Sequence, residues 1–275
     1  MDLGYYLNFD KLPIKSDNPM AWLAADTAFD PDHYRPPVIG IAALLGDHDS
    51  GLHQHQRGQL LFTQQGCTRI TLDNQLCLLP PTRAAWIPCA VPHRAVMHKT
   101  VDYRSVYLSP ALAARLPTQV RVIEVSALLR AVLEPMAMAP FDTDWHSGRY
   151  AHLLALCLDE IQQAVEQPML LPLPRDKRLA PLLTQLERLP PTLQDLEKQI
   201  GASTKTIGRI FLRETGLGYQ QWRQQWRLMR VIELLASGRS VGYCAFELGF
   251  ASDSALIAFF KGMTGTTPRG YFKSG

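Results

Sequence analysis

One local pattern occurs twice in the last third of the chain, and it constrains the fold more than any other sequence feature. The two copies are TLQDLEKQIGASTKTIGRIFLRETG at 192–216 and SVGYCAFELGFASDSALIAFFKGMTG at 240–265. In each copy an apolar-periodic segment reaches Gly201 or Gly249, a short Ser-bearing turn follows, and a second apolar-periodic segment ends at another glycine. The repeat therefore predicts two copies of a helix, a tight turn and a second helix.

The residues at the turns support this prediction. Glycine adopts a left-handed backbone without steric strain, which suits Gly201 and Gly249 at the ends of the first helices. Ser203 and Ser252 stand where a side-chain oxygen would cap the next helix. In helix-turn-helix units of this kind the second helix enters the major groove of DNA. One match would be weak evidence, but two copies in one region indicate a DNA-binding module.

The charge distribution is consistent with a polyanionic partner for this region. Residues 175–275 carry ten Arg and five Lys against eight Asp and Glu, a balance of +7, whereas the whole chain has a net charge of +3. Residues 1–174 are therefore mildly acidic, at −4. A basic C-terminal third favours double-stranded DNA as its partner, and ordinary solvation of a charged surface is the competing interpretation.

The segment between the two copies, at 218–238, predicts one long helix. Its apolar face consists of Leu228, Val231, Ile232 and Leu235, and three arginines recur at helical spacing on another face, namely Arg223, Arg227 and Arg230. A helix of about 17 to 19 residues would be roughly 25–30 Å long, near the ~34 Å between successive major grooves on one face of DNA. We expect the arginines either to touch phosphates or to form a solvated face, and Trp222 and Trp226 to lie in the core.

The pattern is different between residues 38 and 108. Short β-rich runs are divided there by Gly, Pro and Asp-Asn: VIGIAALL, GQLLFT, CTRITL, QLCLLP, AAWIP, HRAVM and DYRSVYL. Their regular spacing predicts a small antiparallel barrel or sandwich, with a hairpin turn at Asp73-Asn74. The predicted fold class is α+β: an antiparallel β-barrel followed by an all-α domain with two helix-turn-helix units joined by a linker helix.

Helical spacing returns between Trp145 and Gln167. This amphipathic segment either packs against the barrel or pairs with the same helix of a second subunit in a homodimer. It is followed at 168–178 by PMLLPLPRDKR, whose three prolines break helical structure. We therefore expect residues 1–170 to form a sensing and dimerising domain, and residues 171–275 to form the DNA-binding domain.

Other features concern the cellular compartment. No apolar run approaches the 18 residues that a membrane span requires. The N-terminus MDLGYYLNFDK lacks the apolar stretch of a secretory signal. The five cysteines are odd in number and show no close pairing, unlike a disulfide framework. We expect a cytoplasmic protein without a membrane partner.

A second motif, GLHQHQRGQ at 51–59, sets two histidines two residues apart. Together with the later His93, they allow three interpretations: a transition-metal site, a pocket for an organic effector, or structural polar groups at the barrel rim. Gln59 stands where a carboxylate would favour a divalent metal, so a metal cofactor is only one of these alternatives. The candidate residues of an effector pocket are His53, His55, Gln59, Phe62, Trp86 and His93, and the candidate metal ligands are His53, His55 and His93.

These motifs resemble two known families. Residues 192–272 resemble the DNA-binding domain of the AraC/XylS family, whose second unit typically ends in the run seen here as FELGFASDSALIAFFKGMTGTTPRGYF. The matching positions are Ala245, Gly249, Phe250, Ser254, Phe260, Lys261, Gly265, Thr267, Pro268 and Tyr271. The β-rich region resembles a cupin barrel, with a first motif His53-x-His55-x₃-Gln59-x₆-Gly66 and a second reduced to the surroundings of Pro88, Pro92 and His93.

The resemblance implies which residues meet DNA, because base contacts in the family come from early, exposed positions of each recognition helix. The corresponding candidates are Thr204, Lys205, Arg209, Ser252, Asp253, Ser254 and Ile257. Gly208, Ile257 and Ala258 have no polar side chain, so Lys205 and Arg209 are the stronger candidates for guanine or phosphate contact. Glu197 replaces the small residue usual at the close helix contact, where looser packing is expected.

The sequence therefore predicts a one-component transcription regulator that is not an enzyme. Its expected partners are operator DNA, a small-molecule effector and a second copy of the chain, with RNA polymerase as a further candidate. One alternative is a metal-dependent cupin enzyme with an accessory helical domain, although no nucleophile motif accompanies the histidines. Another is an interaction module whose helical repeat binds protein.

Overall fold

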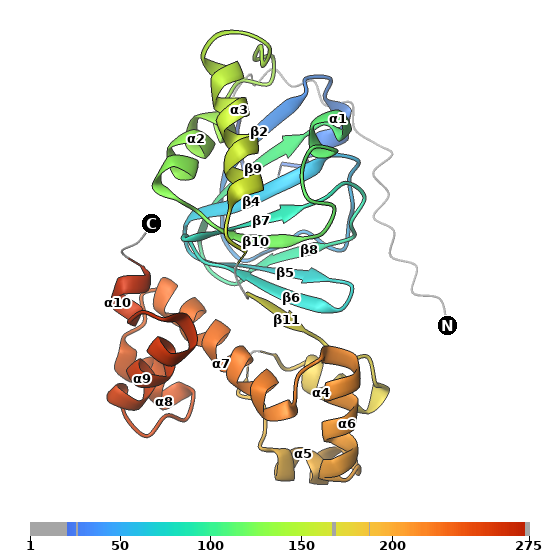
Figure 1. The fold of residues 1–275 in the computed structure, drawn as a ribbon, viewed down its shortest axis with the longest axis vertical. Helices are drawn as coiled ribbons and strands as arrows, with labels where there is room; N and C mark the ends of the chain where they lie inside the picture. Colours follow the sequence, from blue (N-terminus) through green and yellow to red (C-terminus); the bar gives the residue numbers. More distant parts are fainter. Residues whose placement is uncertain (1–20, 26, 167–168, 187, 273–275) are drawn as a thin grey trace.

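The computed structural model describes residues 21–272 except 26, 167, 168 and 187, so the N-terminal segment that bears on secretion lies outside the described residues. The chain forms a β-rich N-terminal part and a helical C-terminal part (Figure 1). The strands are β1 (Trp22–Leu23), β2 (Val38–Leu45), β3 (His48–Asp49), β4 (Gly58–Gln65), β5 (Thr68–Leu72), β6 (Gln75–Leu79), β7 (Arg83–Ile87), β8 (Arg94–Met97), β9 (Val101–Leu108), β10 (Arg121–Glu124) and β11 (Leu170–Pro172). The seven β-rich runs of the sequence are all strands, and Asp73-Asn74 forms the expected turn.

The strands form two sheets that share one apolar interior. The first has the order β1-β2-β9-β4-β7-β10 and the second β11-β6-β5-β8-β3. All of the described strand pairs are antiparallel except β1 with β2. Side chains of both sheets meet in a single cluster that includes Ile39, Leu61, Ile70 and Met97. This architecture confirms the predicted α+β class.

The six-stranded sheet is buried on both faces, because helices cover its outer side. These are α1 (Pro110–Ala113), α2 (Ala127–Ala137) and α3 (Gly148–Gln163). Successive strand residues point to opposite faces, so Leu61 of β4 lies in the interior while Leu60 and Phe62 pack against these helices. The amphipathic helix expected from residue 145 is α3, and its buried face packs on α2 and the sheet. Pairing with a second subunit stays a prediction.

Part of the proline-rich segment at 168–178 belongs to the barrel sheet and not to a free linker. Residues 170–172 form β11, which pairs antiparallel with β6 at the edge of the second sheet, with Pro172 opposite Gln75. An edge strand tolerates proline because one side of its backbone has no partner to bond. The sheet therefore extends slightly beyond the predicted end of the sensing domain at residue 170.

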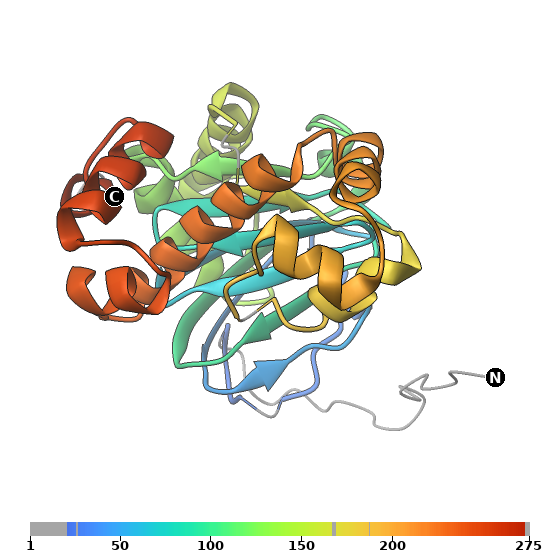
Figure 2. The ribbon, with the colours of Figure 1, turned by 90° about the horizontal axis from the view of Figure 1, so that it is seen from below.

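The helical part is built around one long helix. Its helices are α4 (Ala180–Leu183), α5 (Leu193–Ile200), α6 (Thr204–Thr215), α7 (Tyr219–Ala236), α8 (Val241–Glu247), α9 (Asp253–Thr264) and α10 (Pro268–Tyr271). A short 3-10 turn at Lys177–Leu179 precedes α4, and another lies at Pro31–His33 in the β-rich part. The linker helix α7 has 18 residues, which corresponds to about 27 Å. It passes beneath the second sheet, with α4–α6 at one end and α8–α10 at the other (Figure 2). Among the described residues, none of the helices combines the length and hydropathy of a membrane span.

Two tryptophans attach α7 to its surroundings. Trp222 and Trp226 are buried, as the sequence predicted. The Trp222 indole Nε1 donates to the Pro172 carbonyl at 2.7 Å, and Trp226 Nε1 donates to the Leu186 carbonyl at 3.0 Å. Because Pro172 belongs to β11, α7 is bonded directly to the edge of the barrel.

Candidate functional site

The two helix-turn-helix units, α5–α6 and α8–α9, have matching turns. Gly201 and Gly249 both have a φ of +65°, a conformation that only glycine adopts without strain. Ser203 Oγ accepts a hydrogen bond from the Thr206 amide at 3.2 Å, and Ser252 Oγ accepts one from the Ala255 amide at 3.2 Å. These serines are the N-caps of α6 and α9, as predicted. The second helix of each unit thus begins at a serine N-cap.

Glu197 has a role that its position in the sequence did not suggest. Its carboxylate accepts a hydrogen bond from the Thr204 amide at 3.1 Å, at the first turn of α6. A negative charge is favourable there because the amide groups of the first turn make that end of a helix positive. Glu197 therefore adds a second cap to α6.

Most of the side chains expected to contact DNA are exposed. Lys205 and Arg209 project from α6, while Ser252, Ser254 and Ile257 lie on the exposed surface at the start of α9. Asp253 is exposed as well, with its carboxylate near Gly242 of α8, and Thr204 is half-buried. DNA contact by all seven residues stays a prediction.

The arginines of α7 do not form a solvated face. Arg223, Arg227 and Arg230 are each half-buried and each donates a hydrogen bond within the protein. Of the two alternatives, the solvated face was wrong, because these side chains reach neighbouring elements that the sequence pattern does not reveal.

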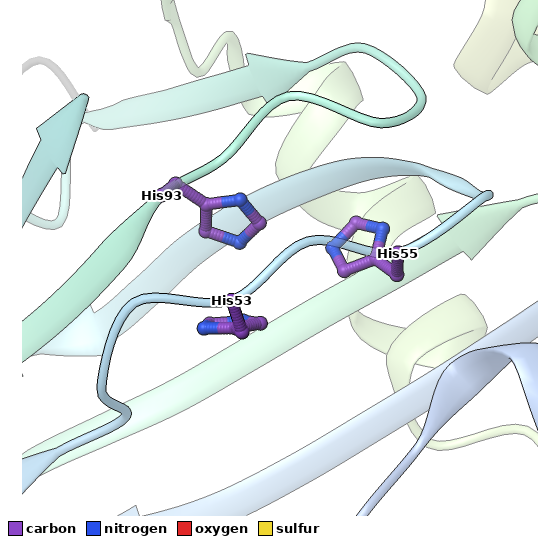
Figure 3. A group of neighbouring side chains, drawn as sticks. All are labelled: His53, His55 and His93. Atoms are coloured by element: carbon purple, nitrogen blue, oxygen red, sulfur yellow. The ribbon is translucent and has the colours of Figure 1, made fainter. Parts of the chain in front are cut away.

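The three histidines of the sequence motifs come together in the barrel (Figure 3). His53 and His93 lie opposite each other in an antiparallel bridge, with reciprocal backbone hydrogen bonds of 3.0 and 2.9 Å. Opposite residues in such a bridge share a face, and their ring centroids are 4.4 Å apart. The His55 ring lies 5.1 Å from that of His93. His55 and His93 are buried and His53 is half-buried.

Hydrogen bonds fix the tautomer of each ring. The Nδ1 atoms of His53, His55 and His93 face the backbone carbonyls of Gly51, Arg57 and Val91, at 3.0, 2.6 and 2.8 Å. A carbonyl only accepts, so each Nδ1 carries the proton and each Nε2 of a neutral ring keeps its lone pair. Burial lowers the pKa of His55 and lowers that of His93 to about 4, because it disfavours the imidazolium form. His93 Nε2 is buried without a hydrogen-bond partner among the described residues.

Gln59 completes this cluster from β4. Its carbonyl oxygen lies 3.2 Å from His55 Nε2, and its amide nitrogen lies 2.9 to 3.1 Å from three buried hydroxyls of β9, those of Tyr103, Ser105 and Tyr107. With a neutral His55, two electron-pair donors thus face each other. Two ligands of one tetrahedral ion at 2.0–2.1 Å would be about 3.4 Å apart, so this pair has the spacing of atoms that share a cation.

The donor set fits a transition-metal ion. One ring nitrogen of each histidine lies within 4.8 Å of the others, whereas two ligands of one ion are at most about 4.2 Å apart. Small rotations of the rings would close this difference. Imidazole nitrogens suit zinc, copper, iron and nickel, and the hydrogen bonds from Nδ1 orient the rings as in established metal sites.

The structure does not bring Phe62 and Trp86 to the histidines. Both are fully buried on the opposite face of the sheet, in the cluster covered by α1–α3, where the Trp86 indole donates to the Pro117 carbonyl at 2.7 Å. Sequence spacing carried this information for Phe62, because residues 59 and 62 of one strand point to opposite faces. The Tyr107 ring packs against the cluster, with its centroid 5.2 Å from that of the His55 ring.

An ion pair at the interface of the barrel and α7 was not visible in the sequence. Arg69 of β5 donates to the Glu233 carboxylate at 2.7 Å, and Arg230 donates to the same oxygen at 2.5 Å. Burial alone would raise the pKa of Glu233, but the two guanidinium groups outweigh it and the pKa is lowered. A cavity of about 610 Å³ lies beside this group, between barrel turns and the end of α7.

Comparison with known proteins agrees with this two-part arrangement. The family model described as an AraC-like ligand binding domain matches residues 35–156, and the model described as a helix-turn-helix domain matches residues 196–274. Between them the two models match well over half of the chain. The chain belongs to the AraC family. As an AraC-family protein with both parts, it is a DNA-binding transcription regulator under effector control.

Two relatives are named as transcriptional regulators. The transcriptional regulator NimR of Escherichia coli is 27% identical over 248 residues, which cover 88% of this chain and 90% of NimR. RipA of Corynebacterium glutamicum is 34% identical over 99 residues, 36% of this chain and 30% of RipA. Among solved structures, a match to ToxT from Vibrio cholerae covers 87% of this AraC-family chain and 99% of the ToxT chain, with 10% identity and a TM-score of 0.35.

Proposed function

We propose that this AraC-family regulator senses a divalent transition-metal ion, held in the barrel by His53, His55, His93 and the Gln59 carbonyl. The observation that carries this proposal is the buried Nε2 atom of His93. An unpartnered buried polar atom is costly, and an ion coordinated there would satisfy it together with the lone pair of His55. The ion would supply positive charge that ties the segment before β4 to the segment before β8.

The same surroundings favour sensing over catalysis. The Nδ1 atoms of the three rings donate to backbone carbonyls, and the Ser50 hydroxyl lies 3.3 Å from His53 Nδ1. The hydroxyls next to them are used to hold Gln59. His53 Nδ1 carries a proton that it donates to the Gly51 carbonyl, so it is not a free base for the Ser50 hydroxyl. We infer that the protein is not an enzyme.

Purified protein is expected to bind one equivalent of Co²⁺ or Zn²⁺ per chain. His93→Ala is expected to lose this equivalent, whereas His152→Ala, which removes an exposed histidine of α3, is expected to keep it. Gln59→Glu is expected to bind the ion about tenfold more tightly, because an anionic ligand replaces a neutral one. Metal content after dialysis and the visible spectrum of Co²⁺ measure both effects. Equal metal content in wild type and His93→Ala would contradict the metal site and leave an organic effector as the occupant.

We further propose that the signal reaches DNA through α7. The Arg69–Glu233 ion pair and the Trp222–Pro172 hydrogen bond join the barrel to this helix, and α7 connects both helix-turn-helix units. An effector that binds one barrel conformation more tightly would shift the position of α7 by no more than its differential affinity. The DNA contacts would come from α6 and α9 through the seven residues named from the family resemblance.

Several further proposals concern assembly and location. Leu128 of α2 and Leu156 of α3 are exposed apolar side chains on neighbouring helices, which supports a homodimer formed through this face. We propose cytoplasmic location from the cysteine usage, with RNA polymerase as a further partner. The division into residues 1–170 and 171–275 stays our proposal for the two domains, with Leu171 and Pro172 completing the barrel sheet.

A further inference from the structure

Arg227 makes contacts that a phosphate-binding side chain would not need. Its Nη2 atom donates to the carbonyls of Leu248 and Gly249, at 2.8 and 3.2 Å. These carbonyls lie at the end of α8, where the last residues of a helix lack intrahelical donors and carry partial negative charge. Arg227 therefore joins the linker helix to the turn of the second helix-turn-helix unit.

The same guanidinium also reaches the second recognition helix. It lies 3.8 Å above the ring centroid of Phe250 and 5.7 Å from that of Phe259, and these two rings are 5.1 Å apart. Phe259 belongs to α9. A planar cation over aromatic rings is favourable and directional, so the position of Arg227 is coupled to the position of α9 through two rings.

One turn earlier, α7 is attached to the first unit. Arg223 Nε donates to the Pro190 carbonyl and the Tyr219 hydroxyl donates to the Pro191 carbonyl, both at 2.7 Å, just before α5 begins. Residues 223 and 227 are about 6 Å apart along the helix axis. The two guanidinium groups thus fasten the two units to one rigid helix at a fixed separation.

We propose that Arg227 is the positioning residue that sets the second recognition helix relative to the first, and that it thereby selects the spacing between the two half-sites in DNA. This inference rests on the proposal that α6 and α9 both enter DNA. A protein that reads two grooves from one chain has affinity for both half-sites only when their spacing matches that of its helices.

The test uses a duplex that the full-length wild-type protein selects from a random pool, and versions of it with one base pair inserted or removed between the half-sites. Arg227→Met removes the donors and keeps the apolar stem. We expect this variant to bind the selected duplex about tenfold more weakly than wild type. On a duplex whose second half-site is scrambled, the loss should be much smaller. The affinity of the variant should also vary less with the spacing between the half-sites. Arg227→Lys keeps the charge but not the planar fork, so it is expected to flatten the spacing dependence as well. Arg149→Met, an exposed charge on α3, should match wild type.

Salt dependence separates this role from a phosphate contact. Each phosphate contact contributes about −0.9 to the slope of log affinity against log salt concentration. We expect both Arg227 variants to keep the wild-type slope. A slope reduced by about one with an unchanged spacing preference would show that Arg227 binds phosphate, and unchanged binding at every spacing would equally overturn the inference. If wild type itself shows no salt-sensitive binding, the DNA-reading proposal fails instead.

Discussion

Glu233→Ala is expected to detach the linker helix from the barrel, at a cost of about 3 kcal/mol or more in the free energy of their association. The reason is that Arg69 and Arg230 would lose the carboxylate that they share, and removing one partner of a buried ion pair is strongly destabilising. Hydrogen exchange of the α7 amides measures this, because detachment exposes the helix without unfolding the barrel. Glu247→Ala, which removes an exposed carboxylate of α8, should leave exchange unchanged.

The pH dependence gives an independent check of the same ion pair. Because the pKa of Glu233 is lowered in the folded protein, its stabilising contribution is present above the pKa of about 4.5 in the unfolded chain and is lost as pH falls through the lower folded value. We therefore expect wild type to loosen this contact below about pH 4.5, and Glu233→Gln to lack that part of the transition. Identical exchange profiles of wild type and Glu233→Gln would contradict the account.

A double replacement of Lys205 and Arg209 by alanine is expected to weaken DNA binding by roughly 100-fold or more. Each side chain is exposed at the start of α6, and a charged contact to a base edge or phosphate contributes about 1–3 kcal/mol. The salt slope should fall by about 0.9 for each phosphate contact removed. Fluorescence anisotropy with a labelled duplex measures both quantities. The control is Arg115→Ala/Arg149→Ala, which removes two exposed charges from the barrel domain.

If this variant bound like wild type, the first recognition helix would not read DNA through its early positions. If it lost affinity with an unchanged salt slope, Lys205 and Arg209 would contact bases rather than phosphates. The helical repeat would be a protein-interaction module if the wild-type chain bound no duplex at any salt concentration.

The helix-turn-helix units were predictable because their shape depends on local chemistry. Gly201 and Gly249 adopt the left-handed conformation and Ser203 and Ser252 cap the following helices, and all four roles follow from residue type and position. The strands were predictable for a similar reason, since β-branched and apolar runs alternate with turn residues.

Features that depend on contacts between distant segments were not predictable. The side chain of Arg227 looked available for phosphate, because nothing in the sequence indicates that the end of α8 lies beside it. Pairing of β11 with β6 and of Arg69 with Glu233 likewise joins segments about 100 residues or more apart.

The candidate sensor site was predictable from the sequence only in part. The spacing of His53 and His55 and the later His93 correctly indicated a cluster. The aromatic residues expected beside it, Phe62 and Trp86, instead lie on the helix-covered face, as strand alternation requires for Phe62 relative to Gln59. The role of Gln59 depends on three hydroxyls of β9, which only the sheet pairing brings into contact with it.

The central claim is that one chain reads two successive half-sites of DNA under the control of its barrel. The most direct measurement is the affinity of the full-length protein for DNA from its own promoter region as a function of salt, with either half-site intact or scrambled. We predict a linear fall of log affinity with log salt concentration and a loss of affinity when either half-site is scrambled. Binding that is insensitive to salt, or that is unchanged when one half-site is scrambled, would contradict the account.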